Sequence, residues 1–220
     1  MEKGTCIIVS AGDFSEFGIN KKQGDLLIAC DAGLKHVLKL YSFPDLIIGD
    51  FDSLGENEED LRLLSSFYND DPDSVIKLNV RKDDTDTLTA IKKGFEKGYT
   101  DFKIFGALGG DRLDHTLANL QSLLYIKRHG GNGKIIDSNK MLTVVENEII
   151  TLNKGLTGRV SVFAMGQKAK GVYLKGLSYE MENGTITEDF PIGVSNEFVP
   201  DKEAEIGVAD GTLLVYIERL

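Results

Sequence analysis

Short apolar runs alternate with amphipathic segments along the first 138 residues. The apolar runs have the length and the branched side chains of buried strands, and the segments between them repeat apolar residues at helical spacing. Strands are predicted at 5–10, 25–30, 46–49, 75–80, 102–105 and 134–136, and helices at 34–40, 57–67, 84–97 and 111–128. Because this alternation favours right-handed crossovers, it predicts a mostly parallel sheet with flanking helices.

The last of these helices has a regular apolar stripe. Its steps are four, three and four residues, and it consists of Leu113, Leu117, Leu120 and Leu124. We expect this stripe to face the core, so that the polar side chains of the first turn point away from it. Those polar side chains share one face at i, i+3 and i+4, and they are Asp111, Asp114 and His115.

The pattern changes near Asn139, after which no helical spacing is convincing. Short alternating runs are separated by turn sequences, and Asn183–Gly184 and Asp210–Gly211 are typical of two-residue hairpin turns of type I′. We therefore expect two domains. Residues 1–138 would form an α/β domain, and residues 139–220 a small all-β domain of the sandwich or barrel type.

The composition is that of an ordinary globular protein, with 41% hydrophobic and 27% charged residues. A formal net charge of −10 argues against a nucleic-acid partner, which needs a basic face. Cys6 and Cys30, the two cysteines, fall in apolar runs and have no zinc-site spacing. The N-terminus has no signal-peptide pattern, and no apolar run reaches about 18 residues, so we expect a cytoplasmic protein without a membrane partner.

Acidic residues follow the predicted strands at the same end. Asp31 follows the second strand, Asp50 and Asp52 follow the third, and Asp86 lies between the fourth strand and the next helix. The carboxyl ends of parallel strands share one edge of a sheet, whereas solvated turns would scatter acidic residues over both edges. Carboxylates gathered in one crevice repel one another unless a proton or a cation lies among them. Magnesium, which shares oxygen ligands with substrate phosphates, is therefore the expected cofactor.

Glycines in two loops allow a phosphate group to approach the backbone. Gly12 follows the first strand, and Gly109 and Gly110 precede the last helix, next to the planar guanidinium of Arg112. The chain lacks the Gly-x-x-x-x-Gly-Lys-Ser/Thr sequence of P-loop enzymes. It also lacks Gly-x-Gly-x-x-Gly after the first strand, which weakens a dinucleotide-binding interpretation. The residues favour a magnesium–phosphate site of another kind.

Several motifs occur along the chain in a characteristic order. The first four are Asp31-Ala32-Gly33, Gly49-Asp50-Phe51-Asp52-Ser53, Asp83-Asp84-Thr85-Asp86 and Gly109-Gly110-Asp111-Arg112-Leu113-Asp114-His115. Two more, in the second predicted domain, are Gly176-Leu177-Ser178-Tyr179 and Ser195-Asn196-Glu197-Phe198. Together they resemble the motifs of thiamine pyrophosphokinases, and the resemblance runs over nearly the whole chain, including the order of an α/β domain followed by a β domain.

The resemblance implies transfer of the diphosphoryl group of ATP to the hydroxyethyl oxygen of thiamine, giving thiamine diphosphate and AMP. It also implies a homodimer in which the α/β domain of one subunit faces the β domain of the other. It places magnesium at Asp50, Asp52 and Asp86. It places the nucleotide near Gly12, Asp31, Gly33, Asp83, Gly109, Gly110 and Arg112. Thiamine and the phosphates would meet at Lys82, Arg112, Asp114 and His115, and thiamine would be held by Tyr179, Ser195 and Asn196.

Two of these roles stay open at the level of the sequence. Arg112 would neutralise phosphate charge, but Asp114 is either the general base for the alcohol or a group that orients thiamine and steadies its cationic ring. Tyr179 either stacks on that ring or is a core aromatic of the β domain. Some members of the family have tryptophan at this position, and this chain contains no tryptophan.

Two other functions fit the same residues. The first is a diphosphokinase of the same architecture that acts on another small alcohol, such as a pterin. The second is a non-catalytic sensor that binds a magnesium nucleotide and signals through its β domain. Formation of AMP with a panel of alcohols separates these three functions.

Overall fold

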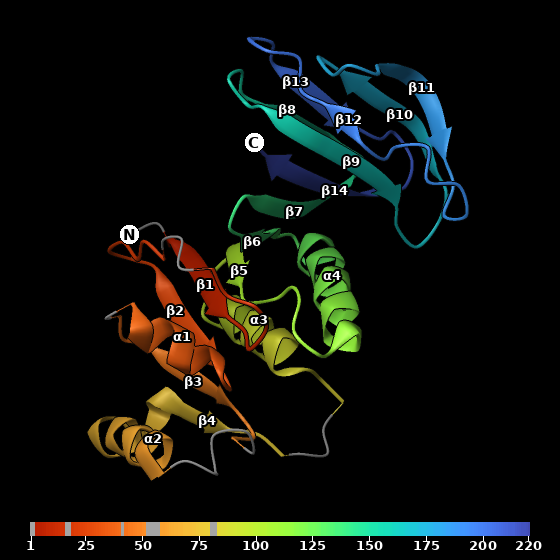
Figure 1. Ribbon diagram of the computed structural model, residues 1–220. Helices are drawn as coiled ribbons and strands as arrows, with labels where there is room; N and C mark the ends of the chain where they lie inside the picture. The colour runs from red at the N-terminus through yellow and green to blue at the C-terminus, as the bar shows by residue number, and fades with distance from the viewer. Residues whose placement is uncertain (1–2, 16–18, 41, 52–57, 80–82) are drawn as a thin grey trace. The chain divides into compact units, whose positions relative to one another are not determined.

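The computed structural model describes residues 3–15, 19–40, 42–51, 58–79 and 83–220 (Figure 1). Contacts divide the chain into two compact units, Met1–Ser138 and Asn139–Leu220. Each unit has its own cluster of buried hydrophobic residues.

The first unit is built on a parallel sheet. Its strands are β1 (Thr5–Val9), β2 (Leu26–Cys30), β3 (Leu46–Gly49), β4 (Val75–Lys77), β5 (Asp101–Phe105) and β6 (Asn132–Asp137). Strand β1 pairs with β2 on one side and with β5 on the other, β3 and β4 extend the sheet beyond β2, and β6 pairs with β5. All of these pairs are parallel, as the alternation of strands and helices predicted. The strand predicted at 75–80 is shorter than expected because β4 ends at Lys77.

Helices cover both faces of this sheet. They are α1 (Gly33–Lys39), α2 (Glu58–Asp70), α3 (Asp86–Glu96) and α4 (Leu113–Arg128), with a 3-10 turn, η1, at Pro72–Ser74. Ile7 of β1 belongs to a buried cluster with Leu34 of α1. Its neighbour Cys6 lies instead against Gly94 of α3. Since successive residues of a strand point to opposite faces, α1 and α3 pack on opposite sides of the sheet. None of these helices is long and apolar enough to cross a membrane.

The buried face of α4 is not the predicted leucine stripe. Leu113 and Leu117 are 70% and 55% exposed. The buried positions of the helix are Asn119, Ser122, Leu123 and Ile126. Polar side chains are tolerated on this inner face because they have partners there: Asn119 Nδ2 donates to the Ala107 carbonyl (2.9 Å), and Ser122 Oγ donates to the carbonyl one turn earlier (3.0 Å). The helix also begins at Leu113, two residues later than predicted.

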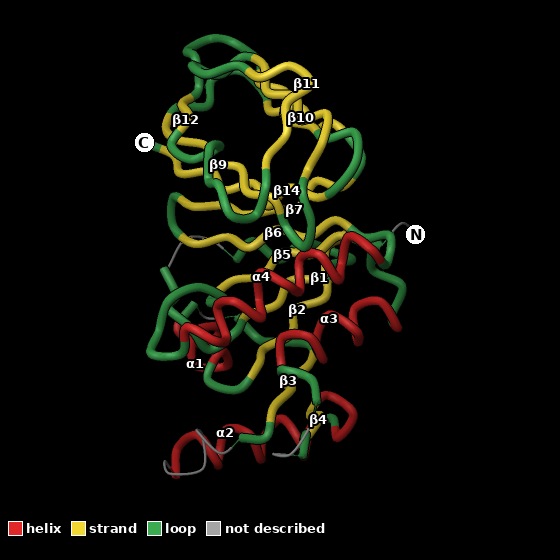
Figure 2. Tube along the Cα trace, turned by 90° about the vertical axis from the view of Figure 1, so that its right-hand side faces the viewer, coloured by secondary structure: helices red, strands yellow, loops and turns green. Residues whose placement is uncertain are grey.

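The second unit is built of strands and loops, and residues 139–220, all of which the structure describes, contain no helix (Figure 2). Its strands are β7 (Lys140–Glu146), β8 (Ile149–Leu152), β9 (Gly158–Ala164), β10 (Ala169–Lys175), β11 (Met181–Ile186), β12 (Asn196–Glu197), β13 (Ala204–Gly207) and β14 (Thr212–Arg219). In one antiparallel layer, β9 lies between β12 and β14, and β7 pairs with β14. In the other layer, β10 lies between β11 and β13, and β8 pairs with β13.

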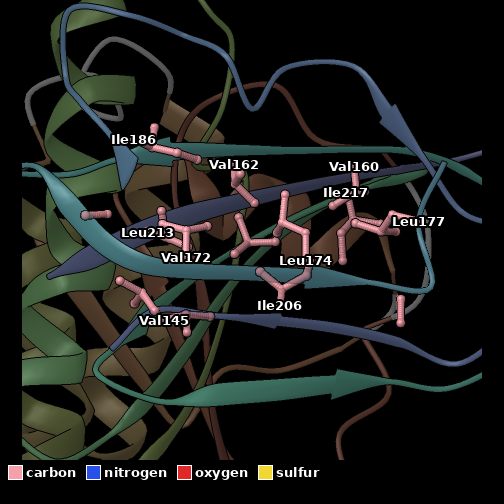
Figure 3. Packing of buried hydrophobic residues seen from close by; sticks show 14 of the residues in the cluster. Val145, Val160, Val162, Val172, Leu174, Leu177, Ile186, Ile206, Leu213 and Ile217 are labelled. Carbon is pink, nitrogen blue, oxygen red and sulfur yellow. The ribbon is translucent and has the colours of Figure 1, made fainter. Parts of the chain in front are cut away.

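The core of the second unit lies between these two layers (Figure 3). Val162 of β9 and Val215 of β14 come from the first layer, and Val172 and Leu174 of β10 and Ile206 of β13 come from the second. Each of these side chains is at most 3% exposed. The residues of both inner faces therefore form one buried cluster, which is the arrangement of a β-sandwich.

The two sequences expected to form hairpin turns behave differently. Asn183–Gly184 lies inside β11, where Asn183 has a φ of +54°, while Gly184 keeps a negative φ; the pairing of β10 with β11 shifts register here. A type I′ turn needs positive φ at both positions, so this prediction was wrong. Asp210–Gly211 lies in the connection between β13 and β14, which belong to different layers, and Asp210 forms an isolated antiparallel bridge with Lys170. It is therefore a link between layers and not a hairpin.

Candidate functional site

A pocket of about 310 Å³ opens at the carboxyl edge of the sheet in the first unit. Ser10 and Gly12 follow β1, Asp31 follows β2 and Gly106 follows β5, and all four line it. The starts of α3 and α4 complete the wall. The chain places β2 on one side of β1 and β5 on the other, so this pocket lies where the strand order changes direction. Open α/β sheets bind ligands at such a point.

The loops after β1 and β5 hold each other in place. Gly12 N–H donates to the Gly106 carbonyl (2.7 Å), and Asp13 N–H donates to the Leu108 carbonyl (3.0 Å). Gly106 has a φ of +60°, and a Cβ at this position would lie 2.3 Å from the Ser10 carbonyl oxygen. Only glycine fits this close approach, which keeps backbone rather than side chains at the rim of the pocket.

Asp31 is fixed beside the end of β3. Its N–H donates to the Ile48 carbonyl (3.0 Å), and its backbone is left-handed, with a φ of +45°. Its Oδ1 accepts a long hydrogen bond from the Phe51 N–H (3.4 Å). Phe51 is 7% exposed and also has a positive φ, +63°, which is unfavourable for a bulky residue. Such strain, held in place by the surrounding structure, is typical of functional sites.

The carboxyl groups of Asp31 and Asp86 meet in the pocket. Thr85 caps helix α3 by accepting a hydrogen bond from the Leu88 N–H (3.1 Å), which places Asp86 in the first helical turn. Burial, a hydrogen bond to Asp86 and the charges of Asp86 and Asp50 raise the pKa of Asp31 from 3.8 to about 7. Asp31 therefore keeps its proton up to about neutral pH unless a cation replaces it.

This donor set fits magnesium. Among the described residues, no group of three or more His, Cys, Asp or Glu side chains is placed to hold a metal ion. Magnesium, however, usually takes only one or two protein carboxylates and completes its shell with water and phosphate oxygens. Asp31 and Asp86 bring two carboxyl groups together in the pocket, and the charge of Asp50 also acts on Asp31. Asp52, another predicted acidic residue of this edge, lies outside the described residues.

Arg112 and Asp114 form an exposed bidentate ion pair. The guanidinium donates through Nε and Nη2 to the two carboxylate oxygens (2.9 and 2.7 Å), and the two side chains are 65% and 64% exposed. The hydrogen bond from Arg112 lowers the pKa of Asp114 to about 2. Arg112 lines the pocket, but Asp114 is not among the lining residues. A carboxylate with so low a pKa is a poor proton acceptor, because a general base works best with a pKa near the operating pH.

The remaining predicted residues of the first unit fall into two groups. Gly109, Gly110 and His115 line the pocket beside α4. Gly33 and Asp83 do not line it: a Cβ on Gly33 would lie 2.1 Å from the Val9 carbonyl oxygen, so this glycine allows α1 to pack closely on β1, and Asp83 is exposed. Lys82 lies outside the described residues.

The predicted thiamine residues lie together in the second unit. Tyr179 N–H donates to Asn196 Oδ1 (2.9 Å), and Asn196 is the neighbour of Ser195 along the chain. The Tyr179 side chain is 74% exposed, so it is not a core aromatic of the sandwich. Ser195 is exposed and Asn196 is buried.

Several polar pocket residues were missed by the sequence analysis. Among them are Ser10, Thr87 and Asn119. Ser10 and Thr87 share a buried hydrogen bond between their hydroxyl oxygens (2.7 Å), which joins the end of β1 to α3. Ser10 is the first polar residue after an apolar strand, which is a usable signal. Asn119 was hidden because the leucine stripe predicted a different inner face for α4.

Comparisons with known proteins identify the family of this chain. A sequence model of the thiamin pyrophosphokinase catalytic domain matches residues 19–135, and a model of the thiamin pyrophosphokinase vitamin B1 binding domain matches residues 146–213. No curated protein sequence gives a significant match.

Solved structures show the same fold over the whole chain. The thiamine pyrophosphokinase from Bacillus subtilis is similar with a TM-score of 0.86 and 24% identity, over 99% of this chain and 100% of that chain. The enzyme from Geobacillus thermodenitrificans has a TM-score of 0.84 and 24% identity, over 99% and 98%. The yeast thiamin pyrophosphokinase has a TM-score of 0.76 and 14% identity, over 100% and 87%.

The family assignment comes from the sequence models, of which the catalytic-domain model alone matches more than half of the chain. The vitamin B1 binding-domain model extends the match into the second unit. The chain therefore belongs to the thiamin pyrophosphokinase family of enzymes.

Proposed function

We propose that the pocket of the first unit holds magnesium ATP and that Tyr179 and Ser195 of the second unit contact thiamine during diphosphoryl transfer. The observation that carries this proposal is the carboxyl pair of Asp31 and Asp86 in a pocket at the switch point of the sheet. Once the proton of Asp31 is lost, a cation can compensate the charge of these carboxyl groups, and a nucleotide triphosphate brings one with it.

The chain's own residues supply position and charge. Gly109 and Gly110, both with positive φ, present backbone rather than side chains to the phosphates, and α4 begins three residues after Gly110, at Leu113. Arg112 lines the same wall and offers a planar fork for phosphate oxygens. Its fork is engaged by Asp114, so phosphate binding would exchange one anionic partner for another. Positioning of this kind is the main requirement of phosphoryl transfer.

Asp50, Asp52 and Asp86 are the proposed magnesium ligands, with Asp31 beside them. When bound, magnesium would neutralise charge on the phosphate groups. Asp31 would then lose its proton, because the cation provides the compensation that the proton supplies in its absence. The raised pKa of Asp31 supports a cation at this place.

The attacking hydroxyl of thiamine needs a proton acceptor or a phosphate oxygen to take its proton. The low pKa of Asp114 disfavours it as a general base while it is paired with Arg112. We therefore assign Asp114 the alternative role, in which it orients thiamine and steadies the cationic ring of thiamine. Lys82 and His115 remain the proposed neighbours of the reacting groups.

A cytoplasmic homodimer is the proposed form of the enzyme. Both cysteines, Cys6 and Cys30, are buried thiols that form no disulfide, as in a reducing compartment. Leu113 and Leu117 in the first unit and Phe190 and Ile192 in the second are large apolar side chains that a single chain leaves exposed. Leu113 and Leu117 are neighbours at i and i+4 on one helix face, and such exposed apolar neighbours are candidates for a partner contact.

The test is AMP formation from ATP and Mg²⁺ with thiamine, with a pterin alcohol and with no alcohol. The proposal expects one AMP per thiamine diphosphate and no turnover without thiamine. Turnover with the pterin alone would indicate the related diphosphokinase. ATP binding without AMP formation would indicate the sensor.

A further inference from the structure

The side chain of Asn196 forms hydrogen bonds to the backbone of Tyr179 through both its oxygen and its nitrogen. Asn196 Oδ1 accepts hydrogen bonds from the N–H groups of Tyr179 and Glu197 (both 2.9 Å). Its Nδ2 donates to the carbonyl of Tyr179 (2.6 Å). Asn196 thus grips the N–H and the C=O of one residue at once, and it is only 6% exposed.

The segment that carries Tyr179 is joined to the Asn196 strand at further points. Ser178 N–H donates to the Glu197 carbonyl (2.9 Å), and Leu177 forms a bridge with Phe198. These contacts also fix the backbone of the two residues before Tyr179, Leu177 and Ser178. The backbone of Tyr179 is therefore held on β12, while its ring is 74% exposed.

A second contact sets the direction of the Asn196 side chain. Ser195 has a left-handed backbone, with a φ of +61°, and its N–H donates to the buried Ser161 Oγ of β9 (3.0 Å). The chain turns at this residue, so that Ser195 is exposed and Asn196 is buried. The two neighbours therefore have different tasks: the hydroxyl of Ser195 is available at the surface, whereas the amide of Asn196 is not.

We infer that Asn196 is a positioning residue that acts through Tyr179, and that it does not contact thiamine. This inference rests on the proposed function, in which the Tyr179 ring stacks on the cationic ring of thiamine. An exposed aromatic ring on a mobile backbone would lose conformational freedom on binding, and that loss would weaken the contact. Asn196 removes this cost in advance by fixing the backbone of Tyr179.

The absence of tryptophan from the chain permits a direct probe. Tyr179→Trp places the protein's only indole at the proposed contact. The inference expects Asn196→Ala in this background to lower the fluorescence anisotropy of that indole before any ligand is added. Asn147→Ala is the matched control, because Asn147 Oδ1 also accepts from a backbone N–H, that of Gly211 (2.9 Å), elsewhere in the same unit. The control should leave the anisotropy unchanged.

The enzyme assay uses the full chain and a double-mutant cycle. Tyr179→Ala should raise the KM for thiamine by roughly 2- to 30-fold, the range for an aromatic ring against a cation. Asn196→Ala should raise it by no more than that factor, with the KM for ATP unchanged. Asn196→Asp, which keeps the acceptor but loses the donor, should have an intermediate effect. In the Tyr179→Ala background, Asn196→Ala should add nothing.

The outcomes separate the inference from the function on which it rests. An unchanged KM for thiamine in Tyr179→Ala contradicts the proposed contact between Tyr179 and thiamine. The indole anisotropy of Tyr179→Trp still shows whether Asn196 holds the backbone of residue 179 in place. Additive effects of Asn196→Ala and Tyr179→Ala overturn the inference, because they make Asn196 a direct ligand. Unchanged anisotropy in Asn196→Ala also overturns it. If Asn196→Ala acted only by a general loss of folding, its thermal midpoint and its kcat would both fall, and Asn147→Ala would show the same losses. That result would also contradict the inference.

Discussion

The carboxyl group of Asp31 lies directly against the backbone of Gly49: a Cβ added to Gly49 would be 1.9 Å from Asp31 Oδ1. This contact joins the ends of β2 and β3, and it leaves room for Asp31 only because residue 49 has no side chain. Gly49, which precedes Asp50 in the motif, thus makes space for the carboxyl group of Asp31.

Gly49→Ala should therefore displace the Asp31 carboxyl group. Because a carboxyl group can rotate away, we expect the fold to survive. A misplacement of about 1 Å can cost roughly a hundredfold in kcat/KM, and we expect a loss of that size. Circular dichroism and steady-state kinetics measure the two effects. In an Asp31→Ala background the added methyl group meets no carboxyl group, so Gly49→Ala should then cause little further loss; an equal further loss would show that the contact with Asp31 is not the cause.

Asp50→Asn and Asp86→Asn should each lower kcat by at least about a hundredfold, because each removes charge from the proposed magnesium site. Both variants should raise the Mg²⁺ concentration needed for half-maximal activity. Asp101→Asn is the matched control, since Asp101 begins β5 at the opposite edge of the sheet and accepts a hydrogen bond through Oδ1 from Asn132 (3.3 Å). Full activity of Asp50→Asn at limiting Mg²⁺ would show that the metal assignment is wrong.

The stability of the metal-free protein should fall as pH rises toward neutrality. Burial, the hydrogen bond to Asp86 and nearby charges raise the pKa of Asp31 from 3.8 to about 7, so the folded state keeps a proton that the unfolded chain releases. The resulting stabilisation is complete below about pH 4 and is lost as pH rises through about 7.

Magnesium should reverse this loss, since it replaces the proton. Thermal midpoints with and without Mg²⁺, at about pH 6 and pH 8, test the linkage. We expect a larger rise on adding Mg²⁺ at pH 8. Asp31→Asn should flatten the pH dependence of the metal-free protein. An equal Mg²⁺ effect at both pH values would argue that no proton is displaced at Asp31.

Asp114→Asn should reduce kcat much less than Asp50→Asn does. Arg112 lowers the pKa of Asp114 to about 2, so Asp114 is not tuned to accept a proton near neutrality. The variant should mainly change the KM values for ATP and thiamine, because a neutral Asn at position 114 weakens the ion pair that positions Arg112. Kinetics across pH decide the point: if Asp114→Asn removed the acidic limb of the kcat profile, Asp114 would be the general base after all.

A site shared between two subunits can be tested by mixing inactive variants. Asp50→Asn impairs the proposed magnesium site in the first unit, and Tyr179→Ala impairs the proposed thiamine contact in the second. After subunit exchange, half of the dimers are mixed and each has one intact site. Measured at thiamine concentrations well below KM, where Tyr179→Ala loses activity through its raised KM, the mixture should gain about a quarter of the wild-type activity above the residual activity of the two variants. Activity no greater than the sum of the separate variants would place each site within one chain.

The edge of acidic residues was predictable because it depends on chain order alone. Asp31 and Asp86 follow or precede elements whose apolar runs are unambiguous, and parallel strands bring their carboxyl ends to one edge. The carboxyl groups of Asp31 and Asp86 do lie together at this edge. Element ends were predicted less well. The helix predicted at 57–67 ends at Asp70, and several strand ends differ from the prediction by a few residues, because the local pattern does not fix the last turn of an element.

The inner face of α4 was not predictable from hydrophobicity. Leu113 and Leu117 were the obvious core residues, yet Asn119 and Ser122 are buried in their place. Their burial depends on carbonyl groups that only the folded structure brings within reach, among them that of Ala107. The same holds for Asn196, whose partners become visible only when the Tyr179 segment lies beside β12.

The most direct test of the account is a crystal structure with thiamine, Mg²⁺ and α,β-methylene ATP, an analogue that cannot release its diphosphoryl group. The account predicts a magnesium ion coordinated by Asp50 and Asp86 oxygens and by phosphate oxygens, at about 2.1 Å, in the pocket between β1 and β5. A nucleotide bound elsewhere, with the carboxyl groups of Asp50 and Asp86 facing only water, would contradict it.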